Sequence, residues 1–415
     1  MSADRLPRLL AGWHAGGSIA LAEHLDLHGR LPLPASRGSA ELIARVQRSG
    51  LRGRGGAAFP VATKMQAVAA APRRRRRLVL ANGAEGEPAS TKDSTLLESC
   101  PHLVLDGVAA AVAAVTADEA IICVKPGAAE GLSHAIAERS GMDRVVPEVV
   151  EVPRGYVVGE ESALINYLNT GAALPTYGAS HPSERGVAGR PTLVQNLETL
   201  AHLALIARHG PEWFRELGTD DDPGSALIDI TGAVASPGLY EIPAGLPLGA
   251  LVEMAGGQSV PLQAFLVGGY AGTWTASEQA LELSLGHAAL RKRGGTLGPG
   301  MVAALPRSSC GVQETARIAR FLADASSGQC GPCMFGLPAI ADGLQAIVEG
   351  LAEPGAHSWV EYWSQLVGGR GACHHPDGAA QMVASALRVF ADDLTRHETG
   401  DSCLAAAFDR GAGIR

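Results

Sequence analysis

Short apolar runs alternate with Ala-rich helical stretches over residues 49 to about 215. The runs LVLANG (Leu78 to Gly83) and AIICVKPG (Ala120 to Gly127) end in turn residues, which is typical of buried strands. The stretch DGVAAAVAAVTA lies between them and has the composition of a packed helix, and PEVVEVP follows as a further strand. This strand–helix–strand order predicts an α/β domain with a parallel sheet.

From about residue 306 the pattern becomes helical. Apolar residues recur at the spacing of one helix face in four segments, which are marked by Ile318, Phe321 and Leu322; by Ile340, Leu344, Ile347 and Leu351; by Trp359, Trp363 and Leu366; and by Val383, Leu387, Phe390 and Leu394. Four amphipathic helices with short connections predict a four-helix bundle.

The middle of the chain has a third pattern. The acidic stretch GTDDDPGS predicts a flexible linker. The next stretch, ALIDITGAVASPGLYEIPAGLPLGALVEMAGG, combines short strands, SPG and PAG turns and one helix, so it predicts a small α+β module. We therefore expect a helical lead-in at 1–48, the α/β domain at 49–217, the α+β module at 225–300 and the helical domain at 306–400.

Composition narrows the class of protein. Among 415 residues, 46% are hydrophobic and 18% are charged, so the chain can bury a sizeable core. The net charge of −8 argues against a general nucleic-acid binder. The longest apolar stretch, Leu103 to Val124, is interrupted by three acidic residues, and the first residues lack the pattern of a secretory signal, so no transmembrane segment is expected. Seven cysteines are too few, and odd in number, for a disulfide scaffold, which favours a cytoplasmic protein with reduced thiols.

Glycines gather in the loop GLRGRGGAAFP, residues 50–60. Gly53, Gly55 and Gly56 carry no Cβ, so their backbone N–H groups can approach an anionic ligand. Lys64 follows where a helix is expected to begin, and its ammonium can pair with a phosphate. The loop matches neither the Rossmann nor the P-loop pattern, and a tight turn explains the glycines equally well.

A polar segment, NGAEGEPASTKD, follows the predicted strand at 78–83. The carboxyl ends of parallel strands are where α/β proteins bind ligands. Asn82 can donate and accept hydrogen bonds at an amide-rich ring, while Glu85 and Glu87 can accept from ring N–H groups or ribose hydroxyls. A surface acidic turn is the alternative.

A second polar segment, GYVVGEESALINYL, spans residues 155–168. Tyr156 offers a stacking face. The sequence Gly159-Glu160-Glu161 places two carboxylates where a helix begins, and the helix dipole favours them there. An acidic first turn without a ligand fits the same residues.

Three cysteines have the spacing of a metal site. Cys330 and Cys333 form a C-x-x-C pair, which holds soft metals well, and Cys373 follows at a distance. These thiols predict an iron–sulfur cluster with one ligand missing. Zinc held with His374 or His375, a redox disulfide within the pair, and inert buried thiols are the alternatives. The remaining cysteines are more typical of small core residues; they are Cys100, Cys123, Cys310 and Cys403.

Four separated motifs occur in the order found in one family. They are SGLRGRGGAAFP, NGAEGEPASTKD with PHLVLDG, GYVVGEESAL with GRPTLVQNLETL, and SGQCGPC followed by Cys373. Together they resemble the NADH-binding flavoprotein subunit of respiratory complex I and the related diaphorase subunits of hydrogenases and formate dehydrogenases, over roughly residues 45 to 400. The resemblance implies an α/β domain with FMN and NADH sites, a soluble-ligand-binding β-grasp domain, and a C-terminal four-helix iron–sulfur bundle. It also implies that electrons pass from NADH through FMN to a [4Fe–4S] or [3Fe–4S] cluster, because a flavin takes two electrons and releases them singly.

The resemblance also assigns the site residues. The FMN contacts it implies are Gly53, Gly55, Gly56, Lys64, Asn82, Glu85, Tyr156, Gly159, Glu160, Asn196 and Thr199. The nicotinamide cofactor would lie over Phe59, with Glu87 and Glu161 nearby. The metal ligands would be Cys330, Cys333 and Cys373, with Ser327, which stands at the family's first cysteine position, or His374 as the fourth. No side chain is needed as a catalytic acid or base, because FMN accepts the hydride. A single cluster requires Cys373 to lie within about 15 Å of the pair.

Three positions depart from the family pattern. Ala84 replaces an acidic residue, Gly178 a lysine and His181 an aromatic residue, which weakens the expected adenine platform. Two alternatives follow: an FMN and iron–sulfur subunit that does not use NADH directly, or a scaffold without cofactors. The family precedent implies ferredoxin-like or iron–sulfur partner subunits within a larger complex, cytoplasmic or peripheral to a membrane through those partners.

Overall fold

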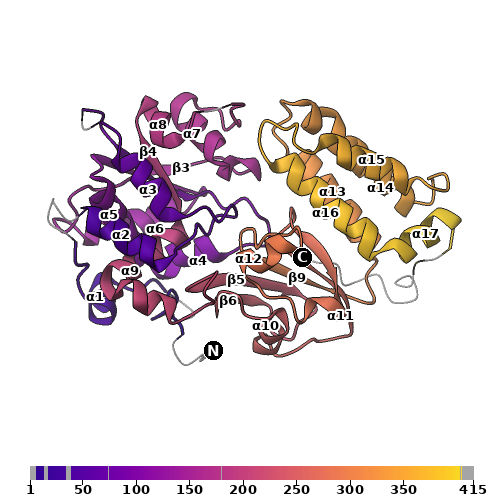
Figure 1. Cartoon of the computed structure of the whole chain (residues 1–415), viewed down its shortest axis with the longest axis horizontal. Coiled ribbons are helices and arrows are strands. Elements are labelled where there is room, and N and C mark those ends of the chain that lie inside the picture. The colour runs from indigo at the N-terminus through magenta and orange to yellow at the C-terminus, as the bar shows by residue number, and fades with distance from the viewer. Residues whose placement is uncertain are drawn as a thin grey trace. The chain divides into compact units, whose positions relative to one another are not determined.

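The computed structural model describes residues 6–13, 17–33, 39–72, 74–178, 180–401 and 403 (Figure 1). The chain forms two compact units. The first comprises residues up to Leu227, without 87–89, together with Glu241–Gly245, and the second comprises Glu87–Ala89, Ile228–Tyr240 and the chain from Leu246 onward. The domain limits expected from the sequence are finer than this division and stay predictions.

A four-stranded parallel sheet forms the centre of the first unit. Its strands are β1 (Leu78–Gly83), β2 (Glu119–Val124), β3 (Glu148–Glu151) and β4 (Thr192–Asn196), in the order β3-β2-β1-β4. The parallel pairing agrees with the alternation in the sequence. The chain steps from β1 to β2 to β3 in one direction and returns on the other side of β1 with β4. The order therefore reverses between β1 and β4, and in such sheets ligands bind at the carboxyl ends of the strands at this point.

Both faces of this sheet are covered. Leu78 and Leu80 share an apolar cluster with residues of α7 (Glu161–Thr170) and η2 (Val157–Gly159). On β1 the residues from Leu78 to Ala81 are fully buried, which is why the strand carries no polar side chain before Asn82. The other helices of this unit are α1 (Leu21–His28), α2 (Ser39–Ser49), α3 (Val61–Ala69), α4 (Lys92–Ser99), α5 (Pro101–Val115), α6 (Ala129–Glu138), α8 (Pro182–Arg185), η3 (Val187–Gly189) and α9 (Leu197–Arg215).

Two segments expected to be peripheral are integral to the first unit. In the lead-in, Leu9 is fully buried and its backbone N–H donates to Glu241 at 2.9 Å. The acidic stretch GTDDDPGS forms a hydrogen-bonded turn in which the Gly224 N–H donates to Leu217 O at 2.8 Å. Gly224 has a positive φ and packs against the Phe214 ring, where any Cβ would clash. The prediction of a flexible linker is wrong, because these contacts fix the turn.

Helices α4 and α5 are joined end to end at a bend of 99°. Within the described residues no single helix has both the length and the apolar character needed to cross a membrane, and α4 and α5 meet those criteria only as a pair.

A mixed five-stranded sheet in the order β6-β5-β9-β7-β8 belongs mostly to the second unit, while the first residues of β5 and the last of β6 are counted with the first unit. Strand β9 is parallel to β5 and antiparallel to β7, which is also antiparallel to β8. The elements are β5 (Ser225–Gly232), β6 (Gly238–Pro243), α10 (Leu248–Met254), β7 (Leu262–Val267), β8 (Thr273–Ala276), α11 (Ser277–Ala280), α12 (His287–Lys292) and β9 (Met301–Pro306).

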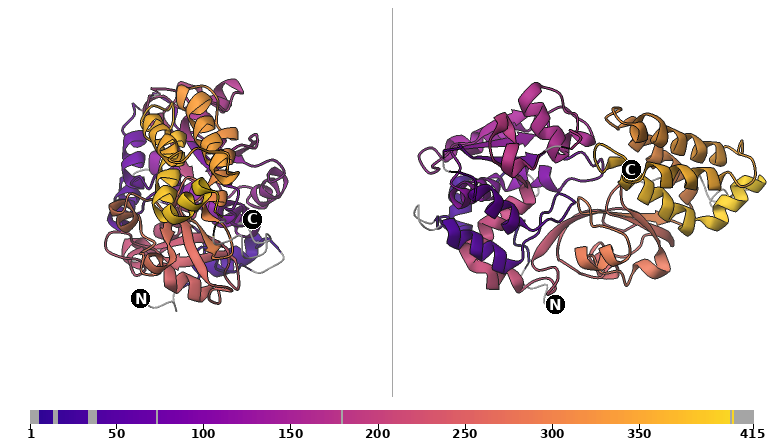
Figure 2. Two further views of the ribbon diagram at one scale, coloured as in Figure 1. Left: turned by 90° about the vertical axis from the view of Figure 1, so that its right-hand side faces the viewer. Right: turned by 45° about the horizontal axis from the view of Figure 1, so that its top comes forward.

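Helices follow in the second unit and lie side by side (Figure 2). They are α13 (Gly311–Asp324), the π-helix η4 (Pro332–Gly336), α14 (Leu337–Val348), α15 (His357–Val367), α16 (His375–Val389) and α17 (Ala391–Thr399). Neighbours in the sequence from α13 to α16 contact one another, and α16 returns to contact α13. The buried face of α15 is Val360, Ser364 and Val367, one position later than predicted. Leu351, expected on α14, lies beyond that helix and is exposed.

A buried ion cluster joins the helices of the first unit. Asp106 on α5 accepts hydrogen bonds from His24 at 2.8 Å, from Arg139 at 2.7 Å and from Arg208. Burial raises the pKa of Asp106, but the hydrogen bond from His24 and the charges of Arg139 and Arg208 outweigh it, so the pKa lies well below its ordinary value. The carboxylate is therefore ionised and holds α1, α5 and α9 together.

Asp106→Asn is expected to lower the free energy of unfolding of the first unit by about 3 kcal/mol at neutral pH, because it leaves the buried guanidinium of Arg208 without its carboxylate and removes one of the two carboxylates that pair with Arg139. Since the folded-state pKa is depressed, this stabilisation is complete above the unfolded value of about 4 and is lost as the pH falls below it. Urea unfolding at several pH values measures both effects. The exposed Glu130→Gln is the control, and equal unfolding curves for the two variants at neutral pH would contradict the assignment.

Candidate functional site

The glycine-rich loop is closed on itself and held against α9. The Gly53 N–H donates to Phe59 O at 2.9 Å, and Arg52 pairs with Pro60 as an isolated bridge. The Arg54 N–H donates to Thr199 Oγ1 at 2.8 Å, and Thr199 lies in the first turn of α9. The loop is thus fixed at the positive end of a long helix, an arrangement that favours anionic ligands.

The carboxyl ends of β1 and β4 bring two asparagines together. Asn82 and Asn196 are register neighbours across the two strands. Asn82 Nδ2 donates to Gly159 O at 2.8 Å, and Asn196 Oδ1 caps α9 by accepting from the Glu198 N–H at 3.0 Å. A Cβ on Gly55 would lie 3.3 Å from the Cβ of Asn196. The structure therefore brings the glycine loop, the end of β1, η2 and the start of α9 to one edge of the sheet.

Two predicted segments approach each other backbone to backbone. A Cβ on Gly159 would lie 2.4 Å from Ala84 O, and one on Gly86 would lie 2.6 Å from Tyr156 O. Neither contact is possible for a real side chain, so glycine is required at both positions. The lack of side chains lets the two segments pack directly against each other, and this junction of Ala84, Gly86, Tyr156 and Gly159 is here called the glycine cradle.

The carboxylates of the second polar segment have separate partners. Glu160 caps α7, since its Oε2 accepts from the Ala163 N–H at 2.9 Å and from Ser162 Oγ at 2.6 Å. Glu161 forms an ion pair with Lys64, and both side chains are about one-third exposed, at 34% and 33%. A ligand phosphate that approached Lys64 would compete with Glu161 for its ammonium. Phe59, the predicted nicotinamide platform, is 48% exposed.

The side chain of Glu85 is enclosed by other residues and is not open to solvent. Its side chain is 2% exposed. Oε1 accepts from Ser90 Oγ at 2.6 Å, and Oε2 accepts from Ser94 Oγ at 2.8 Å and from Lys125 Nζ at 2.9 Å. Burial raises the pKa of Glu85, but the bond from Ser90 and the charge of Lys125 outweigh it and keep the pKa below its ordinary value. Both carboxylate oxygens already accept hydrogen bonds within the protein, and the contact of Glu85 with FMN stays a prediction.

A buried lysine that was not among the predicted site residues connects two motifs. Lys92 is 1% exposed, and its ammonium lies 3.0 Å from Asp93 Oδ1, 3.1 Å from Glu198 Oε2 and 3.2 Å from Asn196 Oδ1. Burial lowers the pKa of Lys92, but Asp93 and Glu198 outweigh it and raise the pKa above its ordinary value. The sequence could have indicated this lysine, because Lys92 and Asp93 lie inside the motif NGAEGEPASTKD and Glu198 lies inside GRPTLVQNLETL.

Glu87 belongs to the second unit. Its side chain is buried, and Oε2 accepts from the Tyr270 N–H at 3.1 Å. Gly269, with a positive φ, leaves room for this carboxylate, because a Cβ there would lie 2.6 Å from Oε2. Glu87 thus accepts a backbone hydrogen bond in this structure, and its contact with NADH stays a prediction.

The three spaced cysteines lie close together around η4. Cys333 lies within this π-helix, a form often found at functional sites, and its thiol interacts with those of Cys330 and Cys373. Burial raises the pKa of Cys330, but hydrogen bonds from the backbone of Ala372 and Cys333 outweigh it and lower the pKa below its ordinary value. Cys373 lies close to Cys330 and Cys333, as binding of one cluster by the three thiols requires. Three soft donors, one of them favoured as a thiolate, suit iron.

The candidates for a fourth ligand differ in their surroundings. Ser327 is half-buried beside this segment. His374 is fully exposed, and its Nδ1 is bonded to Asp377 at 2.9 Å. The Nε2 of His375 is bonded to Leu322 O at 2.7 Å. These contacts leave Nε2 of His374 available, so both Ser327 and His374 can serve as the fourth ligand.

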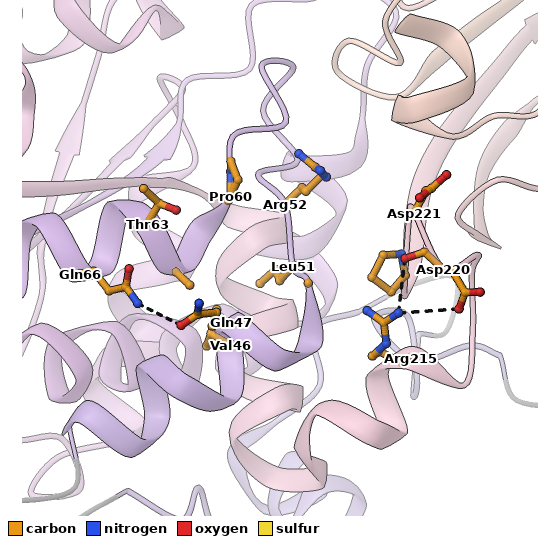
Figure 3. A pocket seen from close by; sticks show the side chains of 13 residues that line it. Val46, Gln47, Leu51, Arg52, Pro60, Thr63, Gln66, Arg215, Asp220 and Asp221 are labelled. Carbon is orange, nitrogen blue, oxygen red and sulfur yellow. Dashed lines mark hydrogen bonds and ion pairs between the residues drawn. The ribbon is translucent and has the colours of Figure 1, made fainter. Parts of the chain in front are cut away.

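A cavity of about 410 Å³ opens at the base of the glycine loop (Figure 3). Arg52 and Pro60 lie at its rim, Gln47 and Gln66 are hydrogen-bonded at 3.1 Å on one side, and Arg215 reaches the backbone oxygen of Asp220 on the other. None of the predicted site residues lines it. This cavity is therefore separate from the predicted site residues.

Three families match successive parts of the chain. Residues 46–205 match the family described as the Nuo51 FMN-binding domain, residues 227–265 match the SLBB domain, and residues 313–397 match the NADH-ubiquinone oxidoreductase-F iron-sulfur binding region. The matches cover the same order of parts that the motifs predicted.

Similar proteins span most of the chain. The F 2 subunit of the NADH-quinone oxidoreductase of Rhizobium meliloti (strain 1021) is 32% identical over 378 residues, which cover 86% of this chain and 88% of that protein. The F subunit of the NADH-quinone oxidoreductase of Escherichia coli (strain K12) is 32% identical over 372 residues, or 85% of this chain and 83% of that protein. An air-oxidised NAD+-reducing [NiFe]-hydrogenase has a TM-score of 0.80 at 31% identity, and the match covers 88% of this chain but only 64% of the hydrogenase chain.

The fold and its two sites define an electron-transfer flavoprotein with an iron–sulfur cluster. The chain belongs to the family of NADH-quinone oxidoreductase F subunits, so the resemblance to the complex I flavoprotein subunit is confirmed. It is an oxidoreductase of the NADH dehydrogenase type, with FMN and a [4Fe–4S] cluster as cofactors and NADH as substrate.

Gly159→Ala is expected to weaken FMN binding by about tenfold or more, because the new Cβ collides with the backbone of Ala84 and forces the cradle open. Fluorescence titration of the apoprotein with FMN measures the affinity. Gly131→Ala on α6 is the matched control, since a Cβ there meets no atom within 4 Å. If the two variants bind FMN equally well, the cradle does not hold the flavin.

Proposed function

We propose that the edge formed by the ends of β1 and β4 holds FMN. The proposal is supported by the convergence of Gly55, Asn82, Gly159 and Thr199 at the point where the strand order reverses. The positive end of α9 and Lys64 would face the phosphate, and the glycine cradle would hold the ring. Bound FMN accepts two electrons from NADH and releases them one at a time.

The nicotinamide ring would lie over Phe59. An aromatic side chain that is half exposed beside the glycine loop offers a stacking face without a large rearrangement. Glu161 neutralises Lys64 until a phosphate arrives, and it then accepts hydrogen bonds from the ligand instead. Orientation and charge are the contributions of the protein, since no group here has to move a proton.

The second unit would combine a β-grasp domain with a four-helix iron–sulfur bundle. Mixed pairing around β9 and the covering helix α10 support the first assignment, and the mutual contacts of α13 to α16 support the second. Cys330, Cys333 and Cys373 would hold the cluster, with Ser327 as the fourth ligand. A ferredoxin-like or iron–sulfur protein subunit is the partner that would receive the electrons.

A second function is favoured by one observation. Gly178 and His181, which stand where the family has a lysine and an aromatic residue, are both exposed. A Cβ on Gly178 meets no atom within 4 Å, so nothing replaces the missing side chain among the described neighbours. If these two positions abolish nucleotide binding, the protein would exchange electrons through FMN and the cluster with protein partners alone.

Anaerobic titration with NADH separates the two functions. Rapid bleaching of the flavin absorbance is expected. Phe59→Ala should raise the apparent dissociation constant of NADH roughly fivefold, because stacking is lost, while the FMN content stays unchanged. Trp13→Ala, at an aromatic residue that is 43% exposed in the same unit, is the control. Absence of bleaching in wild-type protein with full FMN occupancy would favour the second function.

Variants at position 327 test the fourth ligand. Ser327→Cys is expected to retain about four iron atoms per chain, whereas Ser327→Ala should retain about three and show the EPR signal of an oxidised [3Fe–4S] cluster. His374→Ala, which removes an exposed imidazole, should leave the iron content unchanged. Iron loss in His374→Ala but not in Ser327→Ala would contradict the assignment.

A further inference from the structure

Three potential metal ligands meet outside the sites described above. Cys310 caps the N-terminus of α13, His397 lies in the last turn of α17, and Cys403 follows the turn at Gly400 that ends α17. Their donor atoms all lie within 4.8 Å of one another, and Cys310 Sγ is 3.2 Å from His397 Nε2. In a tetrahedral zinc site two sulfurs are about 3.8 Å apart, so this spacing suits one ion.

The surroundings of the two thiols favour a bound cation. Cys310 and Cys403 are 6% and 8% exposed, and both are free thiols. The Gln313 N–H donates to Cys310 Sγ at 3.4 Å, at the positive end of α13. Both thiols are buried, so a thiolate at either position needs a counter-charge. A divalent ion supplies this charge, and the helix dipole adds to the stabilisation.

Asp393 is a second, independent observation. It lies one helical turn before His397 on α17 and is 5% exposed. Its Oδ2 accepts from Gln263 Nε2 at 3.0 Å, while its Oδ1 is buried and has no hydrogen-bond partner among the described residues. Histidines that bind metals commonly donate their other ring N–H to a carboxylate, which fixes the orientation of the ring.

We propose that Cys310, His397 and Cys403 bind a zinc ion, with Asp393 as the positioning residue for His397. On binding, each thiol releases its proton to solvent, and His397 coordinates through the Nε2 lone pair. Two thiolates neutralise the divalent ion, and a water molecule completes the four ligands. Mixed sulfur and imidazole ligation in tetrahedral geometry is characteristic of zinc. The ion would join the start of α13 to the segment after α17.

The metal content of the full chain tests the proposal. The protein is produced with zinc in the medium and purified without oxygen, and zinc, iron and FMN are measured together. About one zinc per chain is expected in wild-type protein. Cys403→Ser and His397→Gln should lose the zinc and keep iron and FMN. Cys123→Ser, at another buried cysteine on β2, and Cys330→Ser, at the cluster, should both keep the zinc.

Zinc-edge X-ray absorption separates this site from zinc held elsewhere. Two sulfurs at about 2.3 Å and one nitrogen at about 2.0 Å are expected. Asp393→Asn should weaken zinc affinity about tenfold or more without changing these distances. His397→Cys should retain zinc with three sulfurs. Retention in this variant would show that His397→Gln loses zinc because a ligand is missing and not because the protein misfolds.

Several results would overturn the proposal. One is a zinc content in wild-type protein no higher than in folded Cys403→Ser. Another is loss of the zinc in Cys330→Ser, which would assign the ion to the cluster cysteines. A disulfide between Cys310 and Cys403 in the intact mass of the anaerobic protein would also overturn it, because the two thiols would then be used up.

Discussion

The buried ammonium of Lys92 is the contact on which the proposed FMN edge of the sheet depends. It joins α4 to the start of α9 through Asp93, Glu198 and Asn196. Burying a charge costs several kcal/mol unless it is fully paired, so these oxygens cannot be withdrawn without loss of the local fold. Asn196 is thereby held in the position that caps α9, and Thr199 is held where the glycine loop docks.

The same principle explains how an acidic motif can serve an anionic ligand. Glu85 is paired with Lys125, Glu161 with Lys64 and Glu198 with Lys92. These lysines offset part of the negative charge of the motifs, which the phosphates of FMN and NADH would otherwise meet at the proposed site. Only the pair of Lys64 and Glu161 is substantially exposed on both sides, so it is the pair that a ligand can rearrange.

Patterns with a fixed local period were predictable from the sequence, and contacts between distant residues were not. The parallel sheet and the site at the end of β1 follow from apolar runs and turn residues. The environment of Glu85 could not be foreseen, because Lys125 reaches it from the end of another strand. The buried face of α15 was predicted one residue too early in the sequence. The prediction relied on tryptophan, which is typical of cores, but Trp359 is 55% exposed here.

The cysteines show the same limit. Cys330 and Cys333 are recognisable because both ligands lie on one turn, whereas Cys310 and Cys403 are brought together only by the packing of α17 against α13. The two sets also differ chemically. Cys330 is half-buried and receives backbone hydrogen bonds that favour its thiolate, while Cys310 is buried beside an imidazole. Three clustered sulfurs suit iron, and a set with a nitrogen at close range suits a single zinc ion, so donor type and spacing support different metals at the two proposed sites.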